Sequence, residues 1–220
     1  MTGLFLVPLA AARRFAPDDY FDVAEVLPGK AIFFIGSGEF RESDIGAYRE
    51  MYVGFYTENR EGGEQSSRIT SFFEFFSNQS KLFMLKNWVS TQVAMDKMDR
   101  AGAEIFRLGK VQRKDVGRKT TFSVEHENDG SIQYSVPRES RIIQKNVMLH
   151  KTHYGRLHGV PSMCQLDLNV KKMSISPLAG ALAMQGKIAR ECRELGIPKK
   201  PLVSIWIEEM SFKMHKPFSL

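Results

Sequence analysis

The chain has 220 residues, 43% of them hydrophobic, so it can bury a substantial core and is not a disordered protein. It carries 31 Lys and Arg against 25 Asp and Glu, a net charge of +6, but no basic run of the kind that forms a nucleic-acid-binding arm. No apolar run is long enough to span a membrane. Cys164 and Cys192 lie among apolar neighbours without metal-binding or redox spacing, so we expect reduced thiols in a cytoplasmic protein.

Most of the chain is predicted to form β-strands. We expect a first strand in residues 4–14 and a second in residues 30–40, whose two glycines are typical of a bulge or of a close backbone approach. A hairpin is expected in residues 119–136, because Asn-Asp-Gly at its centre favours a tight turn. The remaining predicted strands are 47–56, 68–76, 81–85, 162–176 and 201–214.

Two helices are predicted to interrupt the strands. Residues 90–102 have apolar side chains at helical spacing, with Ser90 or Thr91 as the N-cap and a glycine as the stop. Residues 183–198 carry an apolar stripe and end in the stop signal Leu-Gly-Ile-Pro. Because no linker or repeat divides the chain, we expect one domain over residues 1–220, of the α+β class with a curved or closed sheet.

Glu50 lies in the middle of a cleanly alternating strand. A carboxylate surrounded by tyrosines can be oriented by their hydrogen bonds and act as a general acid or base inside a polar cavity. The alternative is that this face is simply a polar outer surface. The first face of the strand carries Tyr48, Glu50, Tyr52 and Tyr56, and the second carries Met51, Val53 and Phe55.

Lys110 ends an extended, mostly apolar run that begins at Glu104. A lysine amine is nucleophilic only when neutral, and apolar walls or nearby cations lower its pKa and favour the neutral form. Ile105 and Leu108 could supply such walls, and Arg113 such a charge. The alternative is a solvated lysine that marks where the chain returns to water.

Two segments resemble the acetoacetate decarboxylase-like superfamily. Residues 43–55, SDIGAYREMYVGF, are similar to its Gly-x-Tyr-x-Glu segment. Residues 101–110, AGAEIFRLGK, are similar to its Ala-Gly-Arg-Glu-x-(aromatic)-Gly-x-Pro-Lys segment, whose lysine forms a Schiff base with a keto substrate. Residues 187–206 resemble the late helix and last strand of the family, so the likeness extends from about Ala31 to the end of the chain.

The resemblance implies a mostly antiparallel, cone-shaped, closed β-barrel with a few helices packed outside. It implies that Lys110 is the Schiff-base lysine, placed at the end of a barrel strand and aimed into a closed cavity, and that Glu50 is the active-site glutamate. Five departures weaken the likeness to acetoacetate decarboxylase itself. Ala103 stands where the family has an arginine after Ala-Gly, and residues 33–36 stand where it has a second acidic residue. Val111 replaces a second lysine, the proline before the lysine is missing, and only Arg13 or Arg14 could replace the carboxylate-binding arginine.

A cluster of histidines follows the predicted hairpin. His150 and His153 would face opposite sides of a strand, a poor arrangement for a shared metal, so we expect no metal site. We expect His153, Tyr154 and Arg156 to bind a substrate carboxylate or hydroxyl at the barrel mouth. Gln165 alternates with apolar residues and either faces the cavity, where it would bind a substrate oxygen, or is an exposed polar residue.

The leading hypothesis is therefore a lyase, of decarboxylase type, that acts on a small keto compound. Lys110 would form the imine, which acts as an electron sink without any cofactor, Glu50 would be the general acid or base, and Tyr48 and Tyr52 would contact the substrate. The alternatives are a cyclase, dehydratase or aldolase on the same barrel, or a non-catalytic member that binds a small ligand. We expect neither nucleic-acid nor membrane partners, and a homo-oligomer, which the aromatic segment 71–76 favours.

Overall fold

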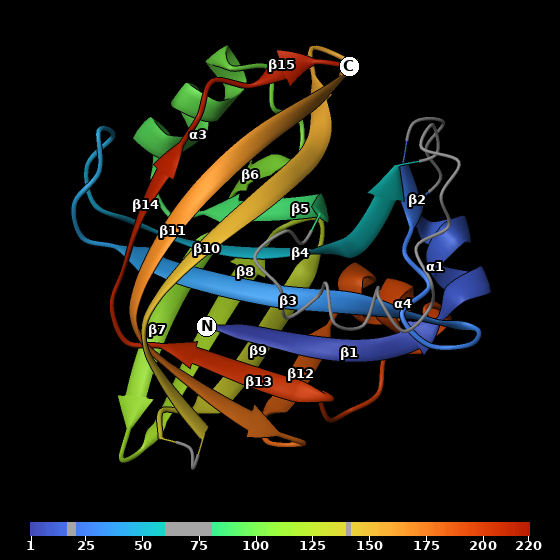
Figure 1. The fold of residues 1–220 in the computed structure, drawn as a ribbon, viewed down its shortest axis with the longest axis vertical. Coiled ribbons are helices and arrows are strands. Elements are labelled where there is room, and N and C mark those ends of the chain that lie inside the picture. The colour runs from blue at the N-terminus through green and yellow to red at the C-terminus, as the bar shows by residue number, and fades with distance from the viewer. Residues whose placement is uncertain (17–20, 60–80, 140–141) are drawn as a thin grey trace.

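The computed structural model describes residues 1–16, 21–59, 81–139 and 142–220 (Figure 1). Seven strands close into a barrel in the order β4-β3-β1-β13-β11-β10-β5, and β5 pairs with β4 to complete it. Apart from the parallel β5–β10 and β5–β6 pairs, the pairing of this sheet is antiparallel. The predicted closed, mostly antiparallel barrel with helices outside it is therefore confirmed.

Seven strands form the barrel, and four short strands pair with some of them. The seven barrel strands are β1 (Thr2–Pro8), β3 (Lys30–Phe40), β4 (Tyr48–Asn59), β5 (Lys81–Val89), β10 (Ile142–Leu157), β11 (Val160–Pro177) and β13 (Val203–Ile207). The added strands are β2 (Phe21–Val23), β6 (Phe106–Leu108), β14 (Met210–Met214) and β15 (Phe218–Ser219). The second sheet consists of β7 (Lys110–Val116), β8 (Lys119–His126), β9 (Gly130–Pro137) and β12 (Ala181–Gln185). The described helices are α1 (Leu9–Phe15), α3 (Gln92–Arg100) and α4 (Lys187–Glu194).

Two apolar clusters show which face of each barrel strand points inward. The lumen cluster joins side chains from strands all around the barrel, and the outer cluster joins the opposite faces of β1, β3, β4 and β5 to the second sheet, α1 and α4. The lumen cluster includes Leu4, Ile32, Phe34, Tyr52, Tyr56, Leu82, Met84, Ile175 and Ile205. The outer cluster includes Phe5, Phe33, Met51, Val53, Phe55, Trp88, Val111, Phe122, Tyr134, Ile188 and Cys192.

The predicted alternation of β4 is confirmed by these clusters. Tyr52 packs in the lumen, whereas Met51 and Phe55 pack outward, against the second sheet that lies behind β1 and β3 in Figure 1. Because the side-chain period of a strand is two residues, this register also places Glu50 on the lumen face.

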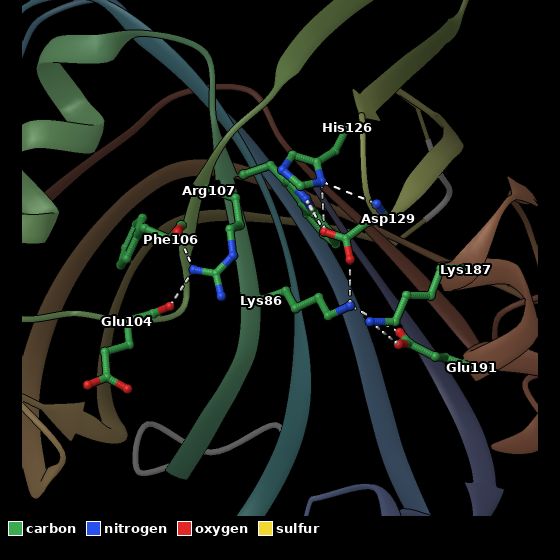
Figure 2. Close-up of polar contacts among 9 residues, drawn as sticks. Lys86, Glu104, Phe106, Arg107, His126, Asp129, Lys187 and Glu191 are labelled. Atoms are coloured by element: carbon green, nitrogen blue, oxygen red, sulfur yellow. Dashed lines mark hydrogen bonds and ion pairs between the residues drawn. The ribbon is translucent and has the colours of Figure 1, made fainter.

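A partly buried polar network joins the barrel to the second sheet and to α4 (Figure 2). Lys86 Nζ on β5 lies 2.9 Å from Asp129 Oδ1 and 3.1 Å from Glu191 Oε2. The other carboxylate oxygen of Asp129 accepts the Trp88 indole N–H at 3.1 Å and lies 3.0 Å from His126 Nδ1. Desolvation opposes these charges, but the hydrogen bonds and charges of the partners outweigh it, so the pKa of Lys86 is raised and that of Asp129 is lowered.

The first predicted helix is confirmed at both ends, whereas the second begins later than predicted, because residues 183–185 belong to β12 and α4 starts at Lys187. Thr91 caps α3, because its side chain accepts the Ala94 N–H, and Gly102 follows the helix with a positive φ of 75°. Val93 was expected on the apolar stripe but is 61% exposed. None of the described helices is long and apolar enough to cross a membrane.

Two strand predictions differ from the structure, and a third falls outside the described residues. The segment 4–14 is a strand only to Pro8, where α1 begins. The segment 201–214 is broken at Glu208 and Glu209 into β13 and β14, both of which pair with β11. The segment 68–76, with the aromatic residues 71–76, lies outside the described residues.

Candidate functional site

Glu50 is a carboxylic acid inside the barrel. The Asn87 side-chain N–H donates to its Oε2 at 3.3 Å from the neighbouring strand β5. Burial raises the pKa of Glu50 to about 7, and the hydrogen bond from Asn87 acts in the opposite direction. A carboxyl group with this pKa exchanges protons readily near neutral pH, which is the property of a general acid or base.

Tyr52 and Tyr48 flank Glu50 on the same face of β4. Burial raises the pKa of both phenols, and the Glu50 charge raises it further, so both remain protonated and can donate hydrogen bonds. The Tyr52 ring lies over β3 at Gly36, where a Cβ atom would collide with it. The close backbone approach predicted from the glycines of this strand is thus found at Gly36.

Asn87 is the polar residue of this site that the sequence analysis missed. It pairs with Tyr52 across β4 and β5, is 1% exposed, and its Oδ1 accepts no hydrogen bond within the part of the chain that the structure describes. A buried amide oxygen without a partner is costly, and a ligand hydroxyl could satisfy it. The sequence feature that could have identified Asn87 is its position inside the apolar strand 81–89, because buried strands rarely carry an amide side chain.

Lys110 does not join Glu50 in the lumen. It is the first residue of β7, which belongs to the second sheet, and its side chain is 63% exposed and lies 3.4 Å from Glu125 Oε2. Its neighbour Val111 is the residue that packs in the outer cluster; it is 4% exposed and pairs with Val124. The expectation that Lys110 points into a closed cavity from a barrel strand is therefore wrong, because strand alternation exposes it once Val111 packs in the core.

The residues predicted at the barrel mouth lie on different faces. His153 pairs with Leu82 of the lumen cluster, and burial together with the charge of Lys151 lowers the pKa of His153 to about 4. Arg156 has the opposite parity to His153 and donates to the Gly159 carbonyl at 3.1 Å, in the turn between β10 and β11.

Gln165 and Tyr154 also face away from the lumen. Gln165 is exposed and pairs with Thr152, so its cavity-facing alternative is wrong. Tyr154 packs outside the barrel against Phe21, with ring centroids 4.6 Å apart. Of the predicted mouth residues, His153 is thus the one on the lumen face.

His150 forms a polar cluster outside the barrel. Asp167 Oδ1 lies 2.7 Å from His150 Nδ1, and Asp167 Oδ2 lies 2.7 Å from His215 Nε2. These two hydrogen bonds lower the pKa of Asp167. His215 was not singled out from the sequence because it is distant along the chain. Among the residues in the described ranges, no group of three or more His, Cys, Asp or Glu could hold a metal ion.

No protein-family model and no curated protein matches this sequence. Solved structures match it over its whole length. MppR, an enduracididine biosynthesis enzyme, aligns with a TM-score of 0.64 at 12% identity over 100% of this chain and 85% of its own. MppR complexed with the condensation product of pyruvate and imidazole 4-carboxaldehyde aligns with a TM-score of 0.56 at 14% identity over 99% and 86%.

The acetoacetate decarboxylase of Legionella pneumophila subsp. pneumophila str. Philadelphia 1 is similar as well. It aligns with a TM-score of 0.64 at 11% identity over 99% of this chain and 85% of its own. The matches therefore agree with the barrel described above from its strand pairing. This chain has the fold shared by acetoacetate decarboxylase and MppR.

Proposed function

We propose that this chain is an enzyme, a lyase or a related carbonyl-activating enzyme, that moves protons on a small keto compound bound in the barrel lumen. The observation that carries this proposal is Glu50, a lumen carboxyl group whose pKa burial raises to about 7. A residue with this pKa is present in both protonation states at neutral pH, so it can remove a proton in one step and return it in another.

The groups around Glu50 suit a keto compound. The protonated phenols of Tyr48 and Tyr52 can donate to a carbonyl or enolate oxygen, and the Asn87 amide oxygen can accept from a hydroxyl. Glu50 in its carboxylate form would take a proton from the carbon beside the carbonyl, while the phenols stabilise the enolate that forms. The condensation product of pyruvate held by MppR supports a keto acid as the substrate class.

Loss of CO2, aldol condensation, dehydration and cyclisation all pass through such an enolate or its imine counterpart. The fold does not select among them, because acetoacetate decarboxylase and MppR share it. A decarboxylating lyase remains the leading proposal. Lys110 is not assigned the Schiff-base role, because its side chain is 63% exposed on the outer face of the second sheet.

Exchange of α-protons for deuterium tests the proposal directly. Pyruvate, acetoacetate and simple ketones are incubated with the protein in D2O and followed by proton NMR, with CO2 release measured in parallel. We expect Glu50→Gln to reduce exchange by about 100-fold or more. Glu125→Gln removes a carboxylate that is 64% exposed and is the matched control, expected to exchange at the rate of the unaltered protein.

Two results would contradict the proposal. One is a Glu50→Gln protein that folds and exchanges as fast as the control. The other is ligand binding in the lumen with no exchange or turnover of any compound in the panel, which would favour a non-catalytic binding protein.

A further inference from the structure

The lumen side of the barrel continues past Glu50 as an apolar face of β10, β11 and β14. Cys164 on β11 pairs with His153, which lies beside Leu82 of the lumen cluster. Because alternate residues of a strand share a face, every second residue of β11 from Cys164 to Val170 lies on this same side. The apolar face consists of Met210, Phe212 and Met214 on β14, Leu166, Leu168 and Val170 on β11, and Val147 and Leu149 on β10, next to Lys151 and His153.

The opposite face of the same strands is polar, with Ser211 and Lys213 on β14. A polar face suits contact with water, whereas contiguous exposed apolar side chains mark a surface that binds something. Met210 and Phe212 are each 39% exposed, and Met214 is 56% exposed. Within the described part of the chain, the apolar face therefore keeps much of its area accessible.

Phe212 joins the apolar face to the site of Glu50. Its ring lies edge-on to the Phe40 ring, with centroids 5.4 Å apart, and Phe40 stacks on Tyr48 at 4.6 Å. Phe40 and Tyr48 pair across β3 and β4, and Tyr48 precedes Glu50 by two residues on the lumen face. The apolar face thus turns towards the barrel interior, which suits a ligand that enters the lumen better than a second copy of this chain.

We propose that the apolar face binds an apolar tail of the substrate, which is then a keto compound with a carbon chain longer than those of pyruvate and acetoacetate. This inference rests on the proposed function and deepens it by naming the substrate class. The keto group would lie at Glu50, and the chain would extend over Phe212 towards Met214. The residue steps from Met210 to Met214 span about 14 Å of strand, which accommodates a chain of several carbon atoms, and methionine side chains adapt to chains of different shape.

A series of keto acids of increasing length tests the proposal. Binding of pyruvate, α-ketohexanoate and α-ketodecanoate to the full-length protein is measured by isothermal titration calorimetry, and deuterium exchange of the same compounds is followed by proton NMR. We expect the affinity to rise by about threefold for each added methylene group that contacts the apolar face, and by at least about 100-fold from pyruvate to α-ketodecanoate.

Two methionines on opposite faces provide a matched pair of variants. Met214→Ser, on the apolar face, should lower the affinity for α-ketodecanoate by about tenfold, and Phe212→Ser should do the same. Met148→Ser is the control, because Met148 is 48% exposed but pairs with Asn169 on the polar face, and it should leave the affinity unchanged. Circular dichroism melts establish that each variant folds.

The outcomes separate this inference from the proposed function. Equal affinity for all three keto acids, no binding of α-ketodecanoate, or binding that folded Met214→Ser and Phe212→Ser retain in full overturns the inference, while Glu50-dependent exchange of pyruvate would still support the proposed function. Affinity that depends on chain length and on Phe212, without exchange of any keto acid, supports the tail-binding face and contradicts the enzyme. An assembly that Met214→Ser splits into monomers in sedimentation velocity would make the face an interface between copies and overturn the inference.

Discussion

Lys110 and Glu125 face each other across β7 and β8, with Nζ and Oε2 3.4 Å apart on the exposed face of the second sheet. The adjacent Val111 points the other way and packs in the outer cluster. Two neighbouring residues of one strand are thus in opposite environments, and this makes them a matched pair for mutation.

Lys110→Ala should change the free energy of unfolding by no more than about 1 kcal/mol, because exposed ion pairs contribute little. Val111→Ala removes buried methyl groups beside Val124 and should cost about 2 kcal/mol. Urea denaturation measures both. Equal effects of the two substitutions would contradict the register of β7.

The protonation of Glu50 should make stability depend on pH. Burial raises the pKa of Glu50 from 4.5 to about 7 in the folded protein. Between these two pH values the folded state therefore binds more protons than the unfolded state. The contribution of Glu50 is therefore fully present below pH 4.5 and is lost as the pH rises through 7, by about 3 kcal/mol.

Glu50→Gln does not titrate and should lack this component. The stability of the Gln variant relative to the unaltered protein should rise between pH 4.5 and 7.5, as measured by urea denaturation at several pH values. A difference that stays constant over this range would mean that Glu50 has an ordinary pKa.

Gly36→Ala should destabilise the barrel through Tyr52. The added methyl group would collide with the Tyr52 ring, and overpacking of this kind costs about 1–3 kcal/mol. In a Tyr52→Ala background the same substitution should cost much less, because the ring is gone. A double-mutant cycle of thermal melts measures the coupling, and additive effects would argue against the contact.

Asp129→Ala should loosen the second sheet and α4 from the barrel. The substitution leaves the Trp88 N–H without its acceptor and removes one of the two carboxylates beside Lys86. Loss of one partner of a buried ion pair costs about 3 kcal/mol.

An exposed pair provides the control for Asp129. Lys171 and Glu209 are 60% and 63% exposed, so Lys171→Ala should shift the melting temperature little. Asp129→Ala with a melting temperature equal to that of Lys171→Ala would show that the network in Figure 2 does not support the fold.

Local patterns in the sequence predicted much of the structure. The strict alternation of residues 48–55 assigned Glu50 and Tyr52 to one face and Met51 and Phe55 to the other, because a strand has a period of two whatever it pairs with. The Thr91 cap and the glycine that follows α3 were also predictable, since caps depend on residues only a few positions apart.

Non-local pairing decided the rest. The segment that ends at Lys110 has the composition of a barrel strand, but β7 pairs with β8 in the second sheet, and that register exposes Lys110 and buries Val111. His153 lies on the lumen face because the register of β10 on β5, which is distant along the chain, sets it beside Leu82. The sequence by itself determined which residues share a face, because that follows from the strand period. Only the tertiary structure decided which face is inside, because strand register and the packing of one sheet on another join segments that are far apart in the sequence.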